Sequence, residues 1–461
     1  MKKEISQTLP LKAKISYAIG YFGKNALVLV NTYFLLYFYT DVIQIPAAAA
    51  SIIMMIARIW DAVNDPMMGV IVDKTKSKYG KCRFWLRYLS VPAGVCIALS
   101  YMVPGLNESG RIIWVAVTYI LQGMGTTAVT VPINTLLVTM TNSRLERVRV
   151  GQLNAIASTI GNFTVPALTL PLVNLLGRSN LQRGFSIFAV VLGCIYSLCT
   201  LVTYWGSKGH DEIIEVKEEK SAEENVEKVT IRQMLKVTVT NQYAVAVCVS
   251  YMLYLILSGI MGSTIVYYFQ YNLHNTGLMS VYSTTVTAAS IISIFTMGFF
   301  LKHFGNANAC LIGAAVSGVA CLLRFVTGDS VLTITIVSWA LMGLGSSVMT
   351  HHTQQCIMDS TTFGKQKYNI DTRGIIMSMY TFAQKFGQAV GGVLAAAILA
   401  MVPYVPEKAE QEQSVLNLFY AENITIPLVL SIISVVLFAY IARLEKQMVK
   451  KQQEEEKELA E

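Results

Sequence analysis

The sequence predicts an all-α membrane protein with twelve transmembrane helices in two six-helix halves. Of its 461 residues, 54% are hydrophobic and 14% are charged, whereas soluble proteins carry about 25% charged residues. The mean hydropathy is +0.50. Apolar segments recur along the whole chain, each close to or above the roughly 20 residues that a helix needs to cross a bilayer. These features indicate an integral membrane protein.

Each of the twelve apolar segments is interpreted as one membrane-spanning helix. The expected spans are residues 15–40, 47–72, 84–104, 112–140, 150–176, 184–206, 240–268, 278–301, 308–327, 331–358, 374–402 and 422–442. The first span follows a polar start and is too long for the apolar core of a signal peptide. We therefore expect it to remain in the protein.

Lysine and arginine residues are concentrated in the connections on one side. That side holds Lys2, Lys3, Lys12, Lys14, Lys74, Lys76, Lys78, Lys81, Arg83, Arg87, Arg144, Arg147, Arg149, Lys302, Lys365, Lys367 and Arg373, and the other side holds chiefly Arg111, Arg178, Arg183, Arg324 and Lys408. The positive-inside rule then places both termini in the cytoplasm, which requires an even number of crossings. We expect the protein to lie in the plasma (inner) membrane. The net charge of +8 reflects these connections and does not indicate a nucleic-acid partner.

A polar, mixed-charge interval divides the chain. We expect an N-terminal six-helix half over residues 1–206, a cytoplasmic linker over 207–239, a second half over 240–442 and a charged cytoplasmic tail over 443–461. A short internal repeat supports duplication of a six-helix unit, because segment 69–73 followed by Gly80 has a counterpart in segment 298–302 followed by Gly305. A repeat this short can also arise by chance. Two homologous six-helix halves around a central cavity are the architecture of the major facilitator superfamily.

Cysteine usage and motif content argue against catalysis. The eight cysteines are scattered through apolar segments without paired spacing, so neither a metal cluster nor a disulfide framework is expected. The sequence shows no nucleophile and base pair, phosphate-binding loop or folded soluble domain, which disfavours an enzyme or a receptor. We therefore expect neither an enzymatic activity nor a cofactor.

Two aspartates lie in the second apolar segment. A charge at the centre of a membrane helix costs from about 3 to more than 10 kcal/mol, so such residues usually line an ion or substrate path. Asp61 and Asp65 are four residues apart and share a helix face, with Arg58 nearly on that face. One arginine cannot neutralise two carboxylates, and the remaining negative charge favours a cation. The alternative is an ion pair in which Arg58 only locks helix packing.

Several segments, in order along the chain, are shared with one family. They include residues 14–25 and 37–42, the stretch Arg58-Ile-Trp-Asp-Ala-Val-Asn-Asp-Pro-Met-Met-Gly69 followed by Lys78-Tyr-Gly-Lys-Cys-Arg83, and residues 368–370 and 383–392. Together they resemble the glycoside-pentoside-hexuronide:cation symporter family, of which the melibiose permease is a member. The matches spread over both halves, which makes the resemblance more specific than a single motif.

The resemblance implies roles for ionisable residues. The family's matching acids bind the coupling cation, so Asp61 and Asp65 are expected to bind sodium, lithium or a proton, with help from the hydroxyl of Thr127. The matching lysine, Lys385, is expected to approach the acids from the other half and to connect the cation site with the sugar site. A simpler alternative is that Lys385 extends to the membrane interface.

The sugar site departs from the family pattern. The melibiose permease has acids at the positions of Asn25 and Thr130 and a tryptophan at Asn134. Amides and hydroxyls can still bind sugar hydroxyls, but an α-galactoside becomes doubtful. The expected substrate-binding residues are Lys24, Asn25, Thr130, Asn134, Arg183 and Lys385. The cations among them favour an anionic sugar such as a hexuronide, while neutral glycosides and pentosides remain open.

Other polar residues are given supporting roles. Arg58 is interpreted as a partner of the acids, and Asp359 matches a family carboxylate expected to pair with a basic residue between the halves. Tyr380 could stack on a sugar, although tyrosines more often serve packing. His351 and His352 lie about 100° apart on a helix, so at most one faces a cavity squarely, and a helix-packing hydrogen bond is expected for either.

The sequence therefore predicts a secondary transporter that couples sodium or proton entry to uptake of a glycoside, pentoside or hexuronide by alternating access. Its expected partners are a small sugar, a monovalent cation and the lipid bilayer, and the protein is expected to be monomeric. The alternative is a transporter of a lipid-like or other amphipathic molecule. Polar cavity candidates such as Lys24 and Asn25 argue against that alternative.

Overall fold

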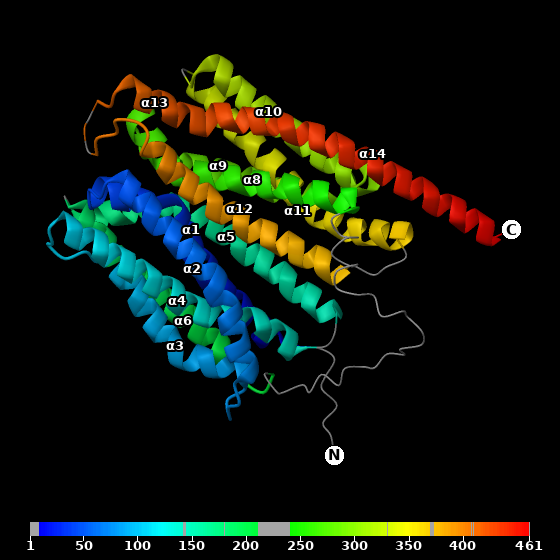
Figure 1. The fold of residues 1–461 in the computed structure, drawn as a ribbon, viewed down its shortest axis with the longest axis horizontal. Coiled ribbons are helices and arrows are strands. Elements are labelled where there is room, and N and C mark those ends of the chain that lie inside the picture. Colours follow the sequence, from blue (N-terminus) through cyan, green and yellow to red (C-terminus); the bar gives the residue numbers. More distant parts are fainter. Residues whose placement is uncertain are drawn as a thin grey trace. The chain divides into compact units, whose positions relative to one another are not determined.

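The computed structural model describes residues 9–141, 144–178, 180–210, 240–329, 331–368, 373–406, 408 and 410–460. Within these residues all regular structure is helical (Figure 1). The all-α prediction is therefore confirmed. Most of the linker expected over 207–239, namely residues 211–239, lies outside the described part of the chain.

The chain divides into two compact units. Unit 1 comprises Met1–Ser221, Asn275–Ser280 and Ala396–Glu412, and unit 2 comprises Ala222–His274, Val281–Ala395 and Gln413–Glu461. Among the described residues, each unit holds six long helices, and unit 2 also holds one short helix.

Unit 1 consists of six consecutive long helices. They are α1 (Leu11–Tyr37), which continues as the π-helix η1 (Phe38–Val42), α2 (Ala47–Lys74), α3 (Lys81–Ser100), α4 (Glu108–Met140), α5 (Arg144–Gly177) and α6 (Leu181–Gly206). Helix α6 packs against α1, α3 and α5, while α4 packs against α2 and α3. The α3 and α6 backbones approach so closely that a Cβ atom on Gly94 would lie 2.5 Å from the carbonyl oxygen of Gly193. Only glycine fits such a contact.

Unit 2 contains the remaining helices. They are α8 (Gln242–Tyr267) with η2 (Tyr268–Asn272), α9 (Leu278–Phe304), α10 (Asn306–Thr327), α11 (Leu332–Tyr368), α12 (Arg373–Leu399), α13 (Gln413–Tyr420), η3 (Ala421–Thr425) and α14 (Ile426–Ala460). Helix α10 packs against α11 and α14, and α8 packs against the same two helices. The last predicted span differs most from the structure, because α13 and η3 precede α14 and α14 continues to Ala460.

The helix lengths fit a membrane protein. In the described part of the chain, ten helical segments are long and apolar enough to cross a bilayer. The other two predicted spans correspond to α1, which carries three lysines, and to α9, whose apolar part is the shorter Leu278–Ser293. Large apolar side chains such as Phe295 and Leu175 are exposed on the helix surfaces. Such surfaces suit contact with lipid rather than water.

Asparagine residues fix where several helices begin. The side chains of Asn107, Asn180 and Asn241 accept hydrogen bonds from backbone N–H groups in the first turns of α4, α6 and α8. An asparagine before a helix satisfies one of the backbone donors that have no partner within the helix. These caps set the register of α4, which carries part of the site described below.

A buried glutamate ties the start of α1 to the start of α5. Glu146 lies 2.6 Å from Lys14 Nζ and 2.7 Å from Arg149 Nη1, and it accepts a hydrogen bond from the Leu9 N–H. The Lys14 hydrogen bond, aided by Leu9 and Arg149, outweighs burial and lowers the pKa of Glu146 below its usual value. The carboxylate therefore stays ionised and holds the two helix starts together.

Candidate cation and sugar sites

The acid pair lies on α2. Asp61 and Asp65 are one helical turn apart, so both carboxylates leave the helix on one face. Pro66 lies within the same helix and, having no N–H, cannot donate to the carbonyl four residues earlier. The site therefore combines two carboxylates with a locally weakened helical backbone.

Each acid has a different polar neighbour. The Thr127 hydroxyl donates a hydrogen bond of 3.0 Å to Asp65 Oδ1. Arg58 Nη1 lies 3.8 Å from Asp61 Oδ2, and these two side chains remain 35% and 34% exposed. A pair this long and this exposed contributes little, at most about 1 kcal/mol. Arg58 thus offsets part of the charge without closing the site.

One face of α4 meets the two acids. A Cβ atom on Gly123 would lie 2.9 Å from Asp61 Oδ1, so the carboxylate rests directly against the glycine. The buried Tyr119 ring lies close enough to sense the charge of Asp61. Tyr119, Gly123 and Thr127 recur every four residues and therefore line one stripe of the helix. The family resemblance indicates Thr127 as a residue of the cation site. No pattern in the sequence indicates that Gly123 and Tyr119 also lie beside the acids.

The donor set favours a small hard cation or a proton. Two carboxylates and one hydroxyl supply only oxygen ligands, which hard cations prefer. No group of three or more His, Cys, Asp and Glu residues suited to a metal ion occurs among the described residues.

The expected sugar-binding residues of unit 1 are only partly brought together. Lys24 Nζ donates a hydrogen bond of 3.1 Å to Asn134 Oδ1 and lies 5.0 Å from the centre of the Tyr21 ring. This contact joins the middle of α1 to α4. Asn25 Nδ2 donates instead to the Ser158 carbonyl on α5, at 3.5 Å. Lys24 and Asn134 thus form a polar pair, with Asn25 one residue away on α1.

Thr130 and Arg183 occupy different levels of unit 1. Thr130 on α4 lies beside the buried ring of Tyr196 on α6. Gly23, which precedes Lys24 on α1, lies against Cys199 on α6. Arg183 is in the first turn of α6, thirteen residues before Tyr196, which corresponds to about 20 Å along a helix axis. The structure therefore does not bring Arg183 to the Lys24 and Asn134 pair.

Known proteins match this chain over nearly its whole length. Residues 16–443 match the family described as MFS/sugar transport protein. The chain belongs to that family. A curated relative, the isoprimeverose transporter of Lactiplantibacillus pentosus, is 27% identical, and the match covers 96% of this chain and 91% of the relative. The glucuronide carrier protein homolog of Escherichia coli is 22% identical, with 90% and 89% covered.

Solved structures agree on the fold. The crystal structure of the nucleoside transporter NupG is similar with a TM-score of 0.61 and 13% identity, covering 94% of this chain and 99% of that chain. The predicted resemblance to the glycoside-pentoside-hexuronide:cation symporters and the predicted major facilitator fold are therefore confirmed. As a member of the family, the chain is a multi-pass membrane transporter and not an enzyme.

The remaining site candidates lie in unit 2. Lys385 is on the exposed side of α12. Tyr380 stacks on Tyr251 with ring centres 4.9 Å apart, and Gln384 Nε2 donates to the Tyr251 hydroxyl at 3.4 Å. Tyr380 is thus already engaged in an aromatic stack within its own unit. That Lys385 connects the cation site with the sugar site stays a prediction.

Asp359 and His352 belong to one hydrogen-bonded chain. Asn306 Nδ2 donates to Asp359 Oδ2 at 2.8 Å, and Asn306 Oδ1 lies 3.0 Å from His352 Nδ1. The amide therefore requires the histidine to donate from Nδ1. His352 is buried and makes the helix-packing hydrogen bond that the sequence predicts. Asp359 accepts its hydrogen bond from an amide of α10, not from a basic residue.

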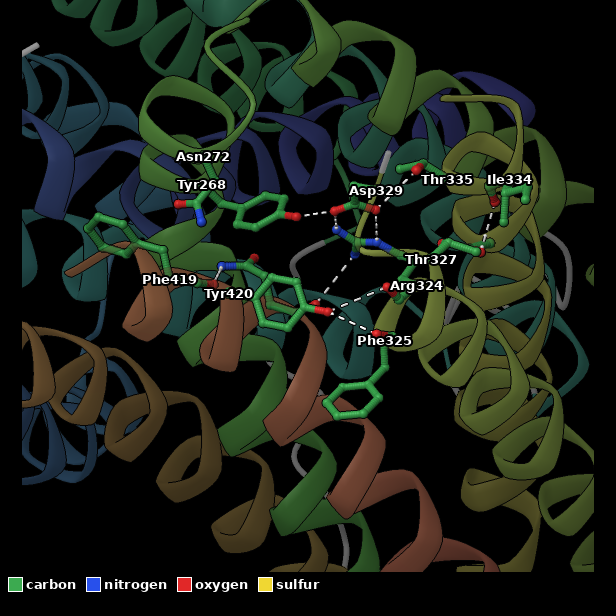
Figure 2. Close-up of polar contacts among 12 residues, drawn as sticks. Tyr268, Asn272, Arg324, Phe325, Thr327, Asp329, Ile334, Thr335, Phe419 and Tyr420 are labelled. Atoms are coloured by element: carbon green, nitrogen blue, oxygen red, sulfur yellow. Dashed lines mark hydrogen bonds and ion pairs between the residues drawn. The ribbon is translucent and has the colours of Figure 1, made fainter. Parts of the chain in front are cut away.

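A second arginine and aspartate pair lies at the C-terminal end of α10. Arg324 Nε and Nη2 donate to the two oxygens of Asp329, both at 2.9 Å, and the side chains are only 6% and 2% exposed. Figure 2 shows Tyr268 and Thr335 directed at the same carboxylate. Burial alone would raise the pKa of Asp329, but the hydrogen bonds and charge of Arg324 outweigh it and hold that pKa below its usual value.

Proposed function

We propose that this protein is a cation-coupled symporter that takes up a glycoside, pentoside or hexuronide by alternating access. The observation that carries the proposal is the contact of Asp61 and Asp65 with one stripe of α4, where Thr127 donates to Asp65. Relatives named for isoprimeverose and for glucuronide support a sugar as the substrate class.

The charge count favours one monovalent ion per cycle. Two ionised aspartates and Arg58 sum to one negative charge, which one sodium ion or one proton would neutralise. Sodium would be bound by carboxylate and hydroxyl oxygens, and a proton would be bound by either carboxylate. Binding of the ion and of the sugar must strengthen one another, typically by about 1 to 3 kcal/mol, for uptake to be coupled.

Lys24 is the proposed selector of the sugar. Its ammonium group is held by the Asn134 amide oxygen and the Tyr21 ring, with neutral side chains at Asn25 and Thr130. A sugar carboxylate is a better partner for the ammonium group than a sugar hydroxyl, because charge-assisted hydrogen bonds are about twice as strong as neutral ones. Hexuronides are therefore the first substrates to test.

The remaining elements of the proposal follow from the sequence. Both termini and the linker over 207–239 are placed in the cytoplasm, and the two six-helix halves are proposed to alternate access as a monomer. Lys385 would reach the ion and sugar sites from the second half. The Arg183 side chain is left out of the sugar site because it lies in the first turn of α6.

Replacing both acids tests the coupling site. In proteoliposomes, the Asp61→Asn and Asp65→Asn double variant should lose sugar accumulation driven by a sodium or proton gradient, because no ionised carboxylate remains for the ion. Glu410→Gln, an exposed residue in a loop, removes one acid elsewhere and should leave accumulation intact. A double variant that still concentrates sugar against its gradient would show that the coupling site lies elsewhere.

A panel of ligands tests the substrate class. Purified protein should gain thermal stability with its sugar, since a ligand that binds only the folded state adds stability by mass action. Glucuronides, neutral glycosides and pentosides are compared with and without sodium and at two pH values. Lys24→Met should remove the response to anionic sugars selectively. A panel in which no saccharide stabilises the protein would favour the amphipathic substrate instead.

A further inference from the structure

A buried glutamate in unit 2 has no role in the proposed coupling site. Glu422 lies in η3, the π-helical turn between α13 and α14, and its side chain is 0% exposed. η3 packs against α8, α10, α13 and α14. The carboxyl group is therefore enclosed on every side by helices of its own unit.

The hydrogen-bond donors beside Glu422 are engaged with other groups. Among the residues that the structure describes, neither carboxyl oxygen has a hydrogen-bond partner. The hydroxyl of Thr264, which lies within reach of the carboxyl group, already donates to the Ile260 carbonyl. The amide of Asn423 donates to Thr264 and to the Phe419 carbonyl, and its own oxygen is also without a partner.

Among the described residues of the helices that pack against η3, no charged side chain is available to offset an ionised Glu422. Helices α8 and α13 contain no Asp, Glu, Lys, Arg or His, and α14 has none before Arg443. The charged residue of α10 is Arg324, whose guanidinium is held by Asp329 and also donates to the Asn423 carbonyl at 3.4 Å.

Two tyrosine hydroxyls at the same end of unit 2 are also engaged. Tyr268 donates to Asp329, and Tyr420 donates to the Phe325 carbonyl at 3.2 Å, as Figure 2 shows. An ionised carboxylate needs donors or a counter-charge when it is removed from water. Near Glu422, in the described part of the chain, the Asn423 amide oxygen is an acceptor without a partner, and the Thr264 hydroxyl oxygen is a second acceptor.

We propose that Glu422 binds a proton and forms a proton site separate from the Asp61 and Asp65 site. The proton supplies the donor that the cluster lacks, because the neutral acid can donate to the free lone pair of the Thr264 hydroxyl or to the orphaned Asn423 amide oxygen. Glu445 in the same unit shows the opposite arrangement, since its carboxylate accepts the backbone N–H groups of Asn306 and Ala307.

The proposal adds a second titratable site to the transporter, in the half that does not contain the acid pair. It does not depend on the proposed symport, because it rests on the interior of unit 2 alone. A proton bound there would be released only when η3 opens to water. The transporter could then respond to pH even if sodium is the coupling ion.

Infrared spectroscopy of the full chain in lipid tests the protonation directly. At neutral pH, the wild-type spectrum should contain a protonated carboxylic acid carbonyl band that is missing from Glu422→Gln, because the amide keeps the shape of the neutral acid but not its carbonyl frequency. Glu410→Gln, which removes an exposed glutamate, should leave the band in place. Thermal unfolding checks that each variant is folded.

A second variant covers the case in which Glu422→Gln does not fold. Thr264→Val removes one proposed acceptor and Asn423→Leu removes the other, so the carbonyl band of the protonated acid should shift in frequency in at least one of them, whereas Thr264→Ser should leave it unchanged. A band that neither variant shifts would overturn the proposal. A protonated-acid carbonyl region that is the same in wild type and Glu422→Gln, with a carboxylate band lost in the variant, would show that Glu422 is ionised and would overturn the proposal. A carboxylate band of Glu422 that changes with sodium would assign the site to that ion and would overturn it equally.

Discussion

Two pairs of arginine and aspartate in this chain use the same chemistry in opposite ways. Arg324 and Asp329 are almost fully buried and joined by two hydrogen bonds of 2.9 Å, with Tyr268 and Thr335 donating to the same carboxylate. In the other pair, the closest approach of Arg58 to Asp61 is 3.8 Å, and a third of each side chain is exposed.

The first pair is structural, whereas the second belongs to the proposed cation site. A carboxylate surrounded by four donor contacts has little capacity for another cation, so the Arg324 pair can only hold α10 and its neighbours together. The loosely paired Asp61 keeps room for an ion beside Asp65. Residues of the same type in apolar segments therefore cannot be assigned a role until their partners are known.

The largest expected effect comes from breaking the closed pair. Arg324→Gln leaves Asp329 buried without its counter-charge, which should cost about 3 to 5 kcal/mol of stability. Thermal unfolding of the purified protein measures the loss, and Arg324→Lys should recover part of it. Because the pKa of Asp329 is lowered in the folded state, wild-type stability from this pair should be lost as pH falls through that lowered pKa. A variant as stable as the wild type would contradict the structural role.

The next effect concerns the proposed cation site. Thr127→Val removes the 3.0 Å hydrogen bond to Asp65, and a hydrogen bond to a charged group is worth about 1.5 to 3 kcal/mol. Cation affinity, measured as the concentration that half-activates sugar uptake, should weaken by about ten- to a hundredfold. Thr127→Ser keeps the hydroxyl and serves as the control. Equal affinities in the two variants would remove Thr127 from the site.

A smaller effect is expected from crowding Asp61. Gly123→Ala places a Cβ atom 2.9 Å from Asp61 Oδ1. The carboxylate is the end of a flexible side chain and can move, so stability should change little while cation affinity falls by about tenfold, or 1.4 kcal/mol. The control is Gly69→Ala on α2, where an added Cβ atom meets nothing within 4 Å. Equal cation affinity in both alanine variants would show that Asp61 does not contribute at its present position.

Much of the fold could be predicted because membrane helices can be recognised in a sequence by their length and apolar composition. The helices of unit 1 all overlap the spans expected from the sequence. The ends of helices were less predictable, since a cap such as Asn107 or a π-helical turn such as η3 depends on hydrogen bonds that hydropathy does not encode. Asp61 and Asp65 stood out because charge in an apolar helix is rare and costly.

The rest of the site depends on packing between helices. Gly123 carries no chemical signal in the sequence, and its role comes from the approach of α2 to α4. The family resemblance predicts Arg183 near the sugar, but the residue lies in the first turn of α6, where the Asn180 side chain caps the helix. Glu422 was overlooked because it lies at the edge of an apolar run, where an exposed and a buried acid look alike.

The smallest expected effect sharpens the comparison of the two arginines. Arg58→Gln makes the same chemical change as Arg324→Gln, but the long and exposed Arg58 pair is worth at most about 1 kcal/mol. Stability should therefore hardly change. Removing a positive charge beside Asp61 should instead strengthen cation binding, by no more than about fivefold, as 1.4 kcal/mol corresponds to tenfold. Unfolding and the half-activating cation concentration are measured together. A large loss of stability, or weaker cation binding, would mean that Arg58 locks the helices, as the packing alternative holds.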